Sequence, residues 1–159
     1  MPRRLLLLLA SLTLTFSLPA RAQTPSLEAL PPLPASVQEN PYRQHPQAIA
    51  LGQALFNHNC ARCHGVDAVN KGQVGPDLTR LERSCLSLRD PEHRQLCIQD
   101  NDHFFYQSVL EGKRRVGVEH MPPWAGVLEP RAIWAIRSFV ESRRSPPPGA
   151  AKPGQAGAP

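Results

Sequence analysis

The sequence is poor in aromatic residues, and it lacks both alternating strand patterns and internal repeats. Aromatic side chains make up 6% of the 159 positions, so the hydrophobic core of the folded part is thin. A small domain with a thin core commonly depends on a disulfide, a metal or a cofactor for stability. No segment alternates polar and apolar residues as a half-buried strand does. These absences argue against an all-β fold and against a repeat protein.

Long hydrophobic runs are absent beyond the N-terminus. The one such run, residues 5–18, follows two arginines and precedes Ala-Arg-Ala at 20–22. This pattern is typical of a secretory signal peptide, here residues 1–22, cleaved near Ala22. The alternative is an uncleaved membrane anchor, which requires roughly 20 apolar residues. No cysteine lies near the cleavage site, which disfavours a lipoprotein. We therefore expect an exported, periplasmic protein.

A large excess of positive charge is also absent from the exported chain. The formal net charge of +5 includes three arginines of residues 1–22, which contain no acidic residue, so the remainder carries +2. Nucleic-acid-binding domains cluster their basic residues. Here they are dispersed, apart from the run Lys113-Arg114-Arg115. The charge gives no indication of nucleic-acid binding.

Proline marks the edges of one domain. Six prolines lie within residues 23–46 and five within 145–159. Such segments bury too little apolar surface to offset the cost of ordering the chain. We expect a Pro-rich N-terminal extension over 23–44, one domain over 45–144, and a disordered tail over 145–159.

The first of three expected helices covers residues 46–59. Its apolar residues follow a 3.6-residue period; they are Ile49, Ala50, Leu51, Ala54, Leu55 and Phe56. Gly52 lies on the same face. Glycine within a helix costs about 1 kcal/mol relative to alanine, and the close approach of a second helix would explain its presence.

The second expected helix covers residues 103–111. Asn101 and Asp102 are candidate N-cap residues and Gly112 would end the helix. Phe105 and Val109, flanked by Phe104 and Leu110, would form its buried face.

The third expected helix begins after Pro130 and runs to residue 144. Its inward residues would be Ile133, Ile136, Phe139 and Val140. Two long loops remain, over 65–99 and 113–129, whose apolar residues need a large apolar group to pack on. The fold class is all-α.

Two cysteines lie three positions apart and are followed by a histidine, in the stretch Cys60-Ala61-Arg62-Cys63-His64. A thioredoxin-like redox pair would need a surrounding βαβ unit. A zinc site would add Cys85 and Cys97, which lack the short spacing of a second ligand pair. The pattern C-x-x-C-H is specific for c-type haem attachment, in which each thiol joins a haem vinyl group. We predict one haem c (iron) on Cys60 and Cys63, with His64 as the proximal iron ligand.

Methionine is scarce, which simplifies the search for a distal ligand. Met121 is the only methionine after Met1, and it is followed by two prolines that stiffen the backbone. Methionine ligation gives a closed electron carrier, so we predict Met121 as the distal iron ligand. The alternatives are that Met121 fills a gap in the core or that His120 is the ligand.

In combination these motifs resemble the class I bacterial cytochromes c. The stretches "GQALFNHNCARCHG", "GPDL", "DNDHFFYQSVLEGK" and "HMPPW" occur in that family's order across residues 45–144. The resemblance implies three main helices and long loops wrapped around one covalent haem. It also implies that the Pro76 carbonyl accepts a hydrogen bond from His64 Nδ1, and that Leu78 packs on the haem.

The same resemblance implies a contact between the first and last helices. Gly52 and Phe56 would meet the last helix near Trp134 and Phe139.

The stretches "NPYR", "NCARCHGVDA" and "WAIRSFVES" resemble the periplasmic cytochromes that accept electrons from PQQ-dependent (quinoprotein) alcohol dehydrogenases. This implies a monomeric one-electron carrier, not an enzyme, that passes electrons to a terminal oxidase or another cytochrome. Lys113-Arg114-Arg115 would dock the partner, unless this run is merely solvated. The alternatives are a carrier for another dehydrogenase, a donor to a terminal oxidase, and a small peroxidase-like haem enzyme with an open distal position.

The segment that carries Cys85 and Cys97 departs from the simplest class I pattern because it is long. In an oxidising compartment two spare thiols favour a disulfide. Two buried free thiols are the alternative.

Overall fold

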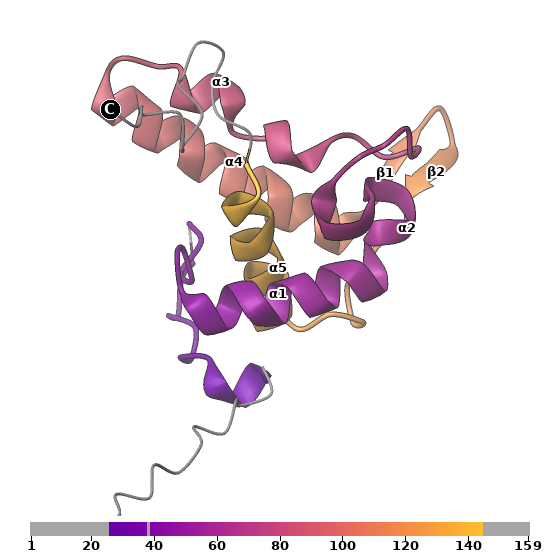
Figure 1. The fold of residues 1–159 in the computed structure, drawn as a ribbon, viewed down its shortest axis with the longest axis horizontal. Coiled ribbons are helices and arrows are strands. Elements are labelled where there is room, and N and C mark those ends of the chain that lie inside the picture. Colours follow the sequence, from indigo (N-terminus) through magenta and orange to yellow (C-terminus); the bar gives the residue numbers. More distant parts are fainter. Residues whose placement is uncertain (1–25, 38, 145–159) are drawn as a thin grey trace, which may run out of the picture.

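The computed structural model describes residues 26–37 and 39–144, which form a mostly helical domain (Figure 1). The main elements are α1 (Pro46–Asn59), α2 (Ala61–His64), α3 (Arg83–Leu86), α4 (Pro91–Glu111), β1 (Lys113–Arg115), β2 (Val118–Met121) and α5 (Pro130–Ser142). Short 3-10 turns lie at Leu27–Ala29 (η1), Val66–Ala68 (η2) and Leu78–Arg80 (η3). The predicted signal peptide and tail lie outside the described residues. Over the part that is described, no helix is both long and apolar enough to cross a membrane.

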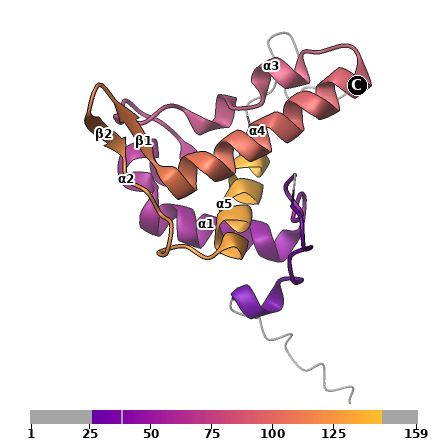
Figure 2. The same cartoon turned by 180° about the vertical axis from the view of Figure 1, so that it is seen from behind.

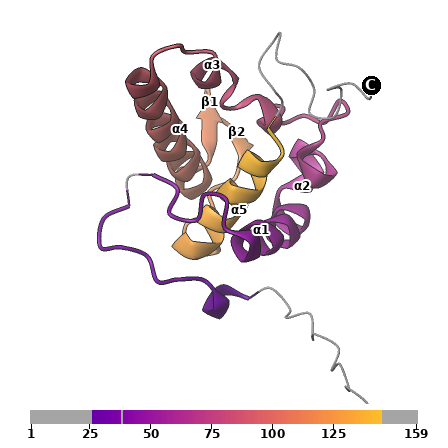
Figure 3. The same ribbon diagram turned by 60° about the vertical axis from the view of Figure 1, so that its left-hand side comes forward.

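Helices α1 and α5 pack directly against each other, as Figure 3 shows. A Cβ atom on Gly52 would lie 2.0 Å from the carbonyl oxygen of Ala135, so only glycine permits this approach. One turn further along α1, the ring of Phe56 lies 5.4 Å from that of Phe139. The expected contact of Gly52 and Phe56 with Phe139 is confirmed. Trp134 instead stacks on Tyr106 of α4, with ring centroids 4.8 Å apart.

Helix α5 is the centre of the domain, because its residues from Ala132 to Glu141 are all buried. The predicted start after Pro130 and the four predicted inward residues are confirmed. One side of α5 packs against the main core cluster, formed by Phe56, Ala68, Phe105, Val109, Ile133, Ile136, Phe139 and Val140. A second cluster forms on Trp134 and Ala135 with Leu30, Tyr42, Ala48 and Leu51.

Helix α4 is more than twice as long as the helix predicted over 103–111. It begins at Pro91, where the Asp90 side chain accepts a hydrogen bond from the Glu92 amide and caps the helix. The predicted N-caps Asn101 and Asp102 are therefore wrong, since both lie inside the helix. Its predicted end at Gly112 is confirmed, with a φ of 70°. Phe105 and Val109 are buried as expected, whereas Phe104 is 54% exposed.

The chain before α4 passes through η3 and α3 and then turns back into α4 (Figure 1). A disulfide between Cys85 and Cys97 joins α3 to α4. The two Cα atoms lie 5.4 Å apart. The predicted loop over 65–99 is thus partly helical. Its last nine residues, 91–99, are the start of α4, which the Asp90-Pro91 capping signal marks.

A small antiparallel hairpin, β1–β2, replaces part of the predicted loop over 113–129. No strand was expected here, because strands of three and four residues are too short to establish a two-residue period. The connecting residues Val116 and Gly117 have φ of 50° and 77°, as in a type I′ turn. A β-branched residue in this conformation costs about 1–3 kcal/mol. The hairpin and α2 lie at one end of the molecule, opposite α3 (Figure 2).

The segment before α1 packs on the domain rather than forming an extended arm. Leu30 and Tyr42 are 4% and 2% exposed, and the Tyr42 hydroxyl donates to the Pro31 carbonyl at 2.6 Å. Arg131 also donates to the Leu27 carbonyl, at 3.0 Å. The expectation that this Pro-rich segment buries little is therefore wrong for its described residues, because two large side chains anchor it on α5.

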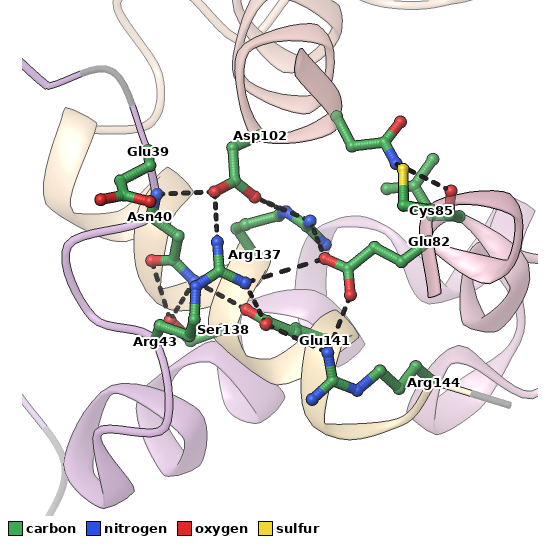
Figure 4. A network of polar contacts seen from close by, with 12 residues as sticks. Glu39, Asn40, Arg43, Glu82, Cys85, Asp102, Arg137, Ser138, Glu141 and Arg144 are labelled. Carbon is green, nitrogen blue, oxygen red and sulfur yellow. Dashed lines mark hydrogen bonds and ion pairs between the residues drawn. The ribbon is translucent and has the colours of Figure 1, made fainter. Parts of the chain in front are cut away.

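A network of charges, buried except at Arg43 and Arg144, fills the other side of α5 (Figure 4). Its members are Arg43, Arg137 and Arg144 and the carboxylates of Glu82, Asp102 and Glu141. Arg137 is fully buried and its Nε donates to Asp102 at 2.7 Å. Asp102 also accepts from the Asn40 amide at 2.8 Å. The network thereby joins the N-terminal segment, α4, α5 and the residue before α3.

We expect Gly52→Ala to destabilise the protein by about 1–2 kcal/mol, because the overlap with Ala135 outweighs the helix propensity that alanine brings. Chemical unfolding of the haem-loaded protein, followed by circular dichroism, measures the change. Ala50, which is exposed in α1 despite its place on the predicted stripe, provides the control. Ala50→Gly should cost about 1 kcal/mol from propensity alone. A more stable Gly52→Ala protein would show that the two helices do not meet this closely.

We expect the double variant Cys85→Ser/Cys97→Ser to lose roughly 3 kcal/mol of unfolding free energy, because the bridge closes a loop with a sequence separation of 12. The same unfolding measurement applies. Reduction with dithiothreitol should lower the wild type toward the variant and leave the variant unchanged. Equal stability of all four samples would contradict a stabilising bridge.

Candidate haem-binding site

The C-x-x-C-H motif forms a helical turn directly at the end of α1. The Cys60 carbonyl accepts hydrogen bonds from the amides of Cys63 and His64, at 3.1 and 3.0 Å. Residues three apart in such a turn lie on the same face, so the two thiols share a side. Both cysteines are half-buried, and neither forms a disulfide. The turn is rigid because α1 fixes its start and Gly65, with a φ of 86°, ends it.

His64 is buried, and its ring is oriented by the chain that passes behind it. Its Nδ1 lies 3.0 Å from the Pro76 carbonyl oxygen. Because a carbonyl oxygen only accepts, Nδ1 is the protonated nitrogen and Nε2 is left as the basic one. Pro76 thus has the position that the resemblance implied for it.

Gly75 allows this segment to lie against the histidine. Its amide donates to the Cys63 carbonyl at 2.8 Å. A Cβ atom at this position would lie 2.7 Å from His64 Nδ1. Asn70 donates to the Gly75 carbonyl at 2.6 Å and holds the segment from its other side. Residues 70–76 therefore form a backbone strap, called here the proximal strap.

Asp67 ties the chain after His64 back to α1. Its carboxylate accepts hydrogen bonds from Asn57 and Gln53, at 2.8 and 2.9 Å. These bonds lower the pKa of Asp67, with the larger effect from Asn57. The Asp67 amide in turn donates to Asn57 Oδ1 at 2.8 Å. The turn of the motif is held at both of its ends.

Met121 ends β2 and is half-buried. Its carbonyl oxygen would lie 2.4 Å from a Cβ atom on Gly112, so glycine is required where α4 ends. The amides of Trp124 and Ala125 donate to the carbonyls of Val109 and Leu110, at 3.0 and 3.2 Å. The methionine loop is thus hydrogen-bonded to the last turn of α4, which fixes its backbone.

Three of the predicted site residues adjoin the same core cluster. Cys60, Leu78 and Met121 all pack against the main core cluster. His120 is exposed and stands apart from the cluster. Two thiols on one face, an oriented imidazole and a thioether fit a covalent haem with axial histidine and methionine.

The other chemistries proposed for the two thiols fit less well. Burial, and to a lesser extent the neighbouring Cys63, raise the pKa of Cys60 to about 11. A redox dithiol needs a lowered thiol pKa. A zinc site would require Cys85 and Cys97 as thiolates, but they form a disulfide. In the described ranges no group of three or more His, Cys, Asp or Glu residues is arranged to hold a metal ion.

Two glycines that position the site were not identified as functional from the sequence. Gly75 and Gly112 carry no chemistry, and only the close approach of another backbone reveals their role. Their places directly before Pro76 and at the end of α4 were the available signals. The docking candidates Lys113, Arg114 and Arg115 form β1 and are exposed.

A family model described as cytochrome c oxidase, cbb3-type, subunit III matches residues 47–140. The chain is 35% identical over 102 residues to cytochrome c550 of Pseudomonas aeruginosa, covering 64% of this chain and 60% of that protein. It is 44% identical over 104 residues to the cbb3-type cytochrome c oxidase subunit CcoP of Rubrivivax gelatinosus, covering 64% of this chain and 28% of that protein. The chain therefore spans less than two thirds of either relative. No solved structure matches it.

We expect Met121→Ala to abolish the far-red sulfur-to-iron charge-transfer band of the oxidised protein and to lower its midpoint potential. No other methionine remains after the first residue to replace the ligand. Visible spectroscopy and a redox titration measure both effects. His120→Ala is the control and should change neither. Persistence of the band in Met121→Ala would identify a different distal ligand.

Proposed function

The chain belongs to the cytochrome c family and carries covalently bound haem c, and from this premise we propose a periplasmic monohaem one-electron carrier. Its proposed donor is a PQQ-dependent alcohol dehydrogenase, and its electrons pass on to the respiratory chain. The helices form a class I cytochrome c fold. The sequence contains a single C-x-x-C-H motif, which supports one haem per chain.

One observation carries the proposal of an electron carrier: each proposed iron ligand has its backbone fixed by the fold. His64 is oriented by the Pro76 carbonyl at 3.0 Å. Met121 is the last residue of the hairpin, and the loop that follows it is hydrogen-bonded to the end of α4. Two fixed axial ligands suit electron transfer, because ligands that stay in place keep the structural change on oxidation small. A haem enzyme instead needs an open distal position.

The proposed roles of the residues follow from their positions. Cys60 and Cys63 would form the thioether bonds, and His64 and Met121 would coordinate the iron. Leu78 and the main core cluster would exclude water from the site. When bound, the haem supplies an iron that alternates between Fe(III) and Fe(II) and so carries one electron. Pro76 would hold the His64 proton on Nδ1, which keeps Nε2 available to the metal.

The acceptor has some support from the relatives. The CcoP relative is by its name a subunit of a cbb3-type oxidase. A terminal oxidase of that type is therefore our proposed acceptor. On the donor side, the second candidate is another periplasmic dehydrogenase. A peroxidase-like enzyme is disfavoured by Met121. Carbon monoxide should leave the spectrum of the reduced protein unchanged, as expected when the distal position is closed.

We expect the oxidised protein to be reduced rapidly by a PQQ-dependent alcohol dehydrogenase and its alcohol, and hardly at all by alcohol alone. Stopped-flow mixing measures the second-order rate constant. Arg115→Glu should lower it about threefold or more at low salt, because charge complementarity mainly sets association rates. Added salt should slow the wild type, since exposed charges are screened over about 10 Å at 0.1 M.

Arg89→Glu is the matched control, with the same charge change on an exposed residue near the α3 end of the molecule. It should slow the reaction less than Arg115→Glu does. Neither variant should shift the midpoint potential. If the dehydrogenase reduces the wild type no faster than it reduces an unrelated cytochrome c, the proposed donor is wrong. The assignment of the haem site does not depend on this result.

A further inference from the structure

The tip of the β1–β2 hairpin combines backbone strain with an exposed apolar side chain. Val116 has a φ of 50° and is 97% exposed. It occupies the first central position of a type I′ turn, where asparagine is the favoured residue because its side chain tolerates positive φ. Valine is branched at Cβ and is poorly suited to this conformation.

Within the described part of the protein, no contact of the Val116 side chain offsets the energetic cost of this backbone conformation. With 97% of its surface exposed, Val116 buries almost no area against its own chain. The hairpin is held together by other means, namely its backbone register and the bond from Arg114 to the Gly117 carbonyl at 3.3 Å. Residues that the surrounding structure holds in a strained backbone conformation cluster at functional sites. A contact with another molecule is the remaining source of compensation.

The surroundings of Val116 indicate the chemistry of that molecule. Lys113, Arg114 and Arg115 precede it and are exposed, and none of them makes an ion pair with another described residue. Val118, which pairs with Arg115, is 58% exposed and adds apolar surface. The tip is therefore a small apolar projection beside a basic strand.

We propose that Val116 inserts into an apolar depression, bordered by acidic residues, on the protein that exchanges electrons with this cytochrome. This inference rests on the proposed function and names the contact by which the partner is recognised. In the hairpin register Met121, the proposed distal ligand, pairs with Lys113 at the base of the hairpin, three residues or about 10 Å along the strand from Val116. A partner seated on the tip is thereby brought close to the ligand loop.

An anionic membrane surface is the competing occupant, since basic and apolar residues also bind lipid. A membrane-binding element normally presents a broad apolar face. Here the tip offers a single fully exposed valine. A protein pocket that fits one side chain is therefore the better match.

The test compares Val116→Asn, Val116→Ile and the control Leu96→Asn, at an apolar residue of α4 that is 51% exposed and has no positive φ. Second-order rate constants are measured with two protein partners, the alcohol dehydrogenase and a cbb3-type oxidase, and with a small uncharged reductant. Val116→Asn should react about five- to tenfold more slowly with the protein partner, because it loses the buried side chain. It should unfold at the same or a higher temperature, because asparagine relieves the strain.

Val116→Ile and Leu96→Asn should keep the wild-type rate with proteins, and all variants should react equally with the small reductant. The proposal is overturned if Val116→Asn reacts as fast as the wild type with every protein partner that reduces or oxidises the wild type. Sedimentation of the wild type, but not of Val116→Asn, with phosphatidylglycerol vesicles would also overturn it. If the wild type reacts with the oxidase but not with the dehydrogenase, the proposed donor is wrong. The rates of Val116→Asn and the wild type with the oxidase then test the role of the tip. A wild type that reacts with neither protein overturns both proposals.

Discussion

The contact between Gly52 and the Ala135 carbonyl is the constraint on which the rest of the fold depends. Because Gly52 has no Cβ, α1 lies directly on α5, and Phe56 then reaches Phe139. The end of α1 is also the start of the C-x-x-C-H turn, so this contact sets where Cys60 and His64 lie relative to the core. A side chain at position 52 would move the site and the core together.

On the far side of α5, charged residues take the place of an apolar core. Three arginines face three carboxylates there, so the positive and negative charges balance. Buried ion pairs commonly contribute little net stability, because desolvation offsets their attraction. Removal of a single partner leaves an unpaired buried charge and is strongly destabilising. The network is therefore better understood as a device that fixes the arrangement of its elements. Asn40 and Arg43 of the N-terminal segment and Arg137 of α5 all bond to Asp102 of α4 in this one arrangement.

The sequence predicts most of what local signals encode. Pro46 and Pro130 mark the starts of two helices correctly, and the period of Ile133, Ile136, Phe139 and Val140 identifies the core face of α5. The Cys60–His64 motif is specific enough to indicate the cofactor unaided. What could not be predicted depends on contacts between distant segments. Aspartate is a residue type that is favoured at N-caps, which is why Asp102 was predicted to be one. Only its pairing with Arg43 and Arg137, 59 and 35 residues away, shows that it is a buried charge.

The two sides of the candidate site are held by backbone rather than by side-chain packing. On one side the proximal strap brings the Pro76 carbonyl to His64, and on the other the end of α4 holds the loop that follows Met121. At both places a glycine admits the neighbouring backbone, Gly75 against His64 and Gly112 against Met121. Backbone contacts of this kind leave little freedom for small displacements, since any shift would break several hydrogen bonds together. That rigidity is what a carrier requires if its ligands are to stay in place while the charge of the iron changes.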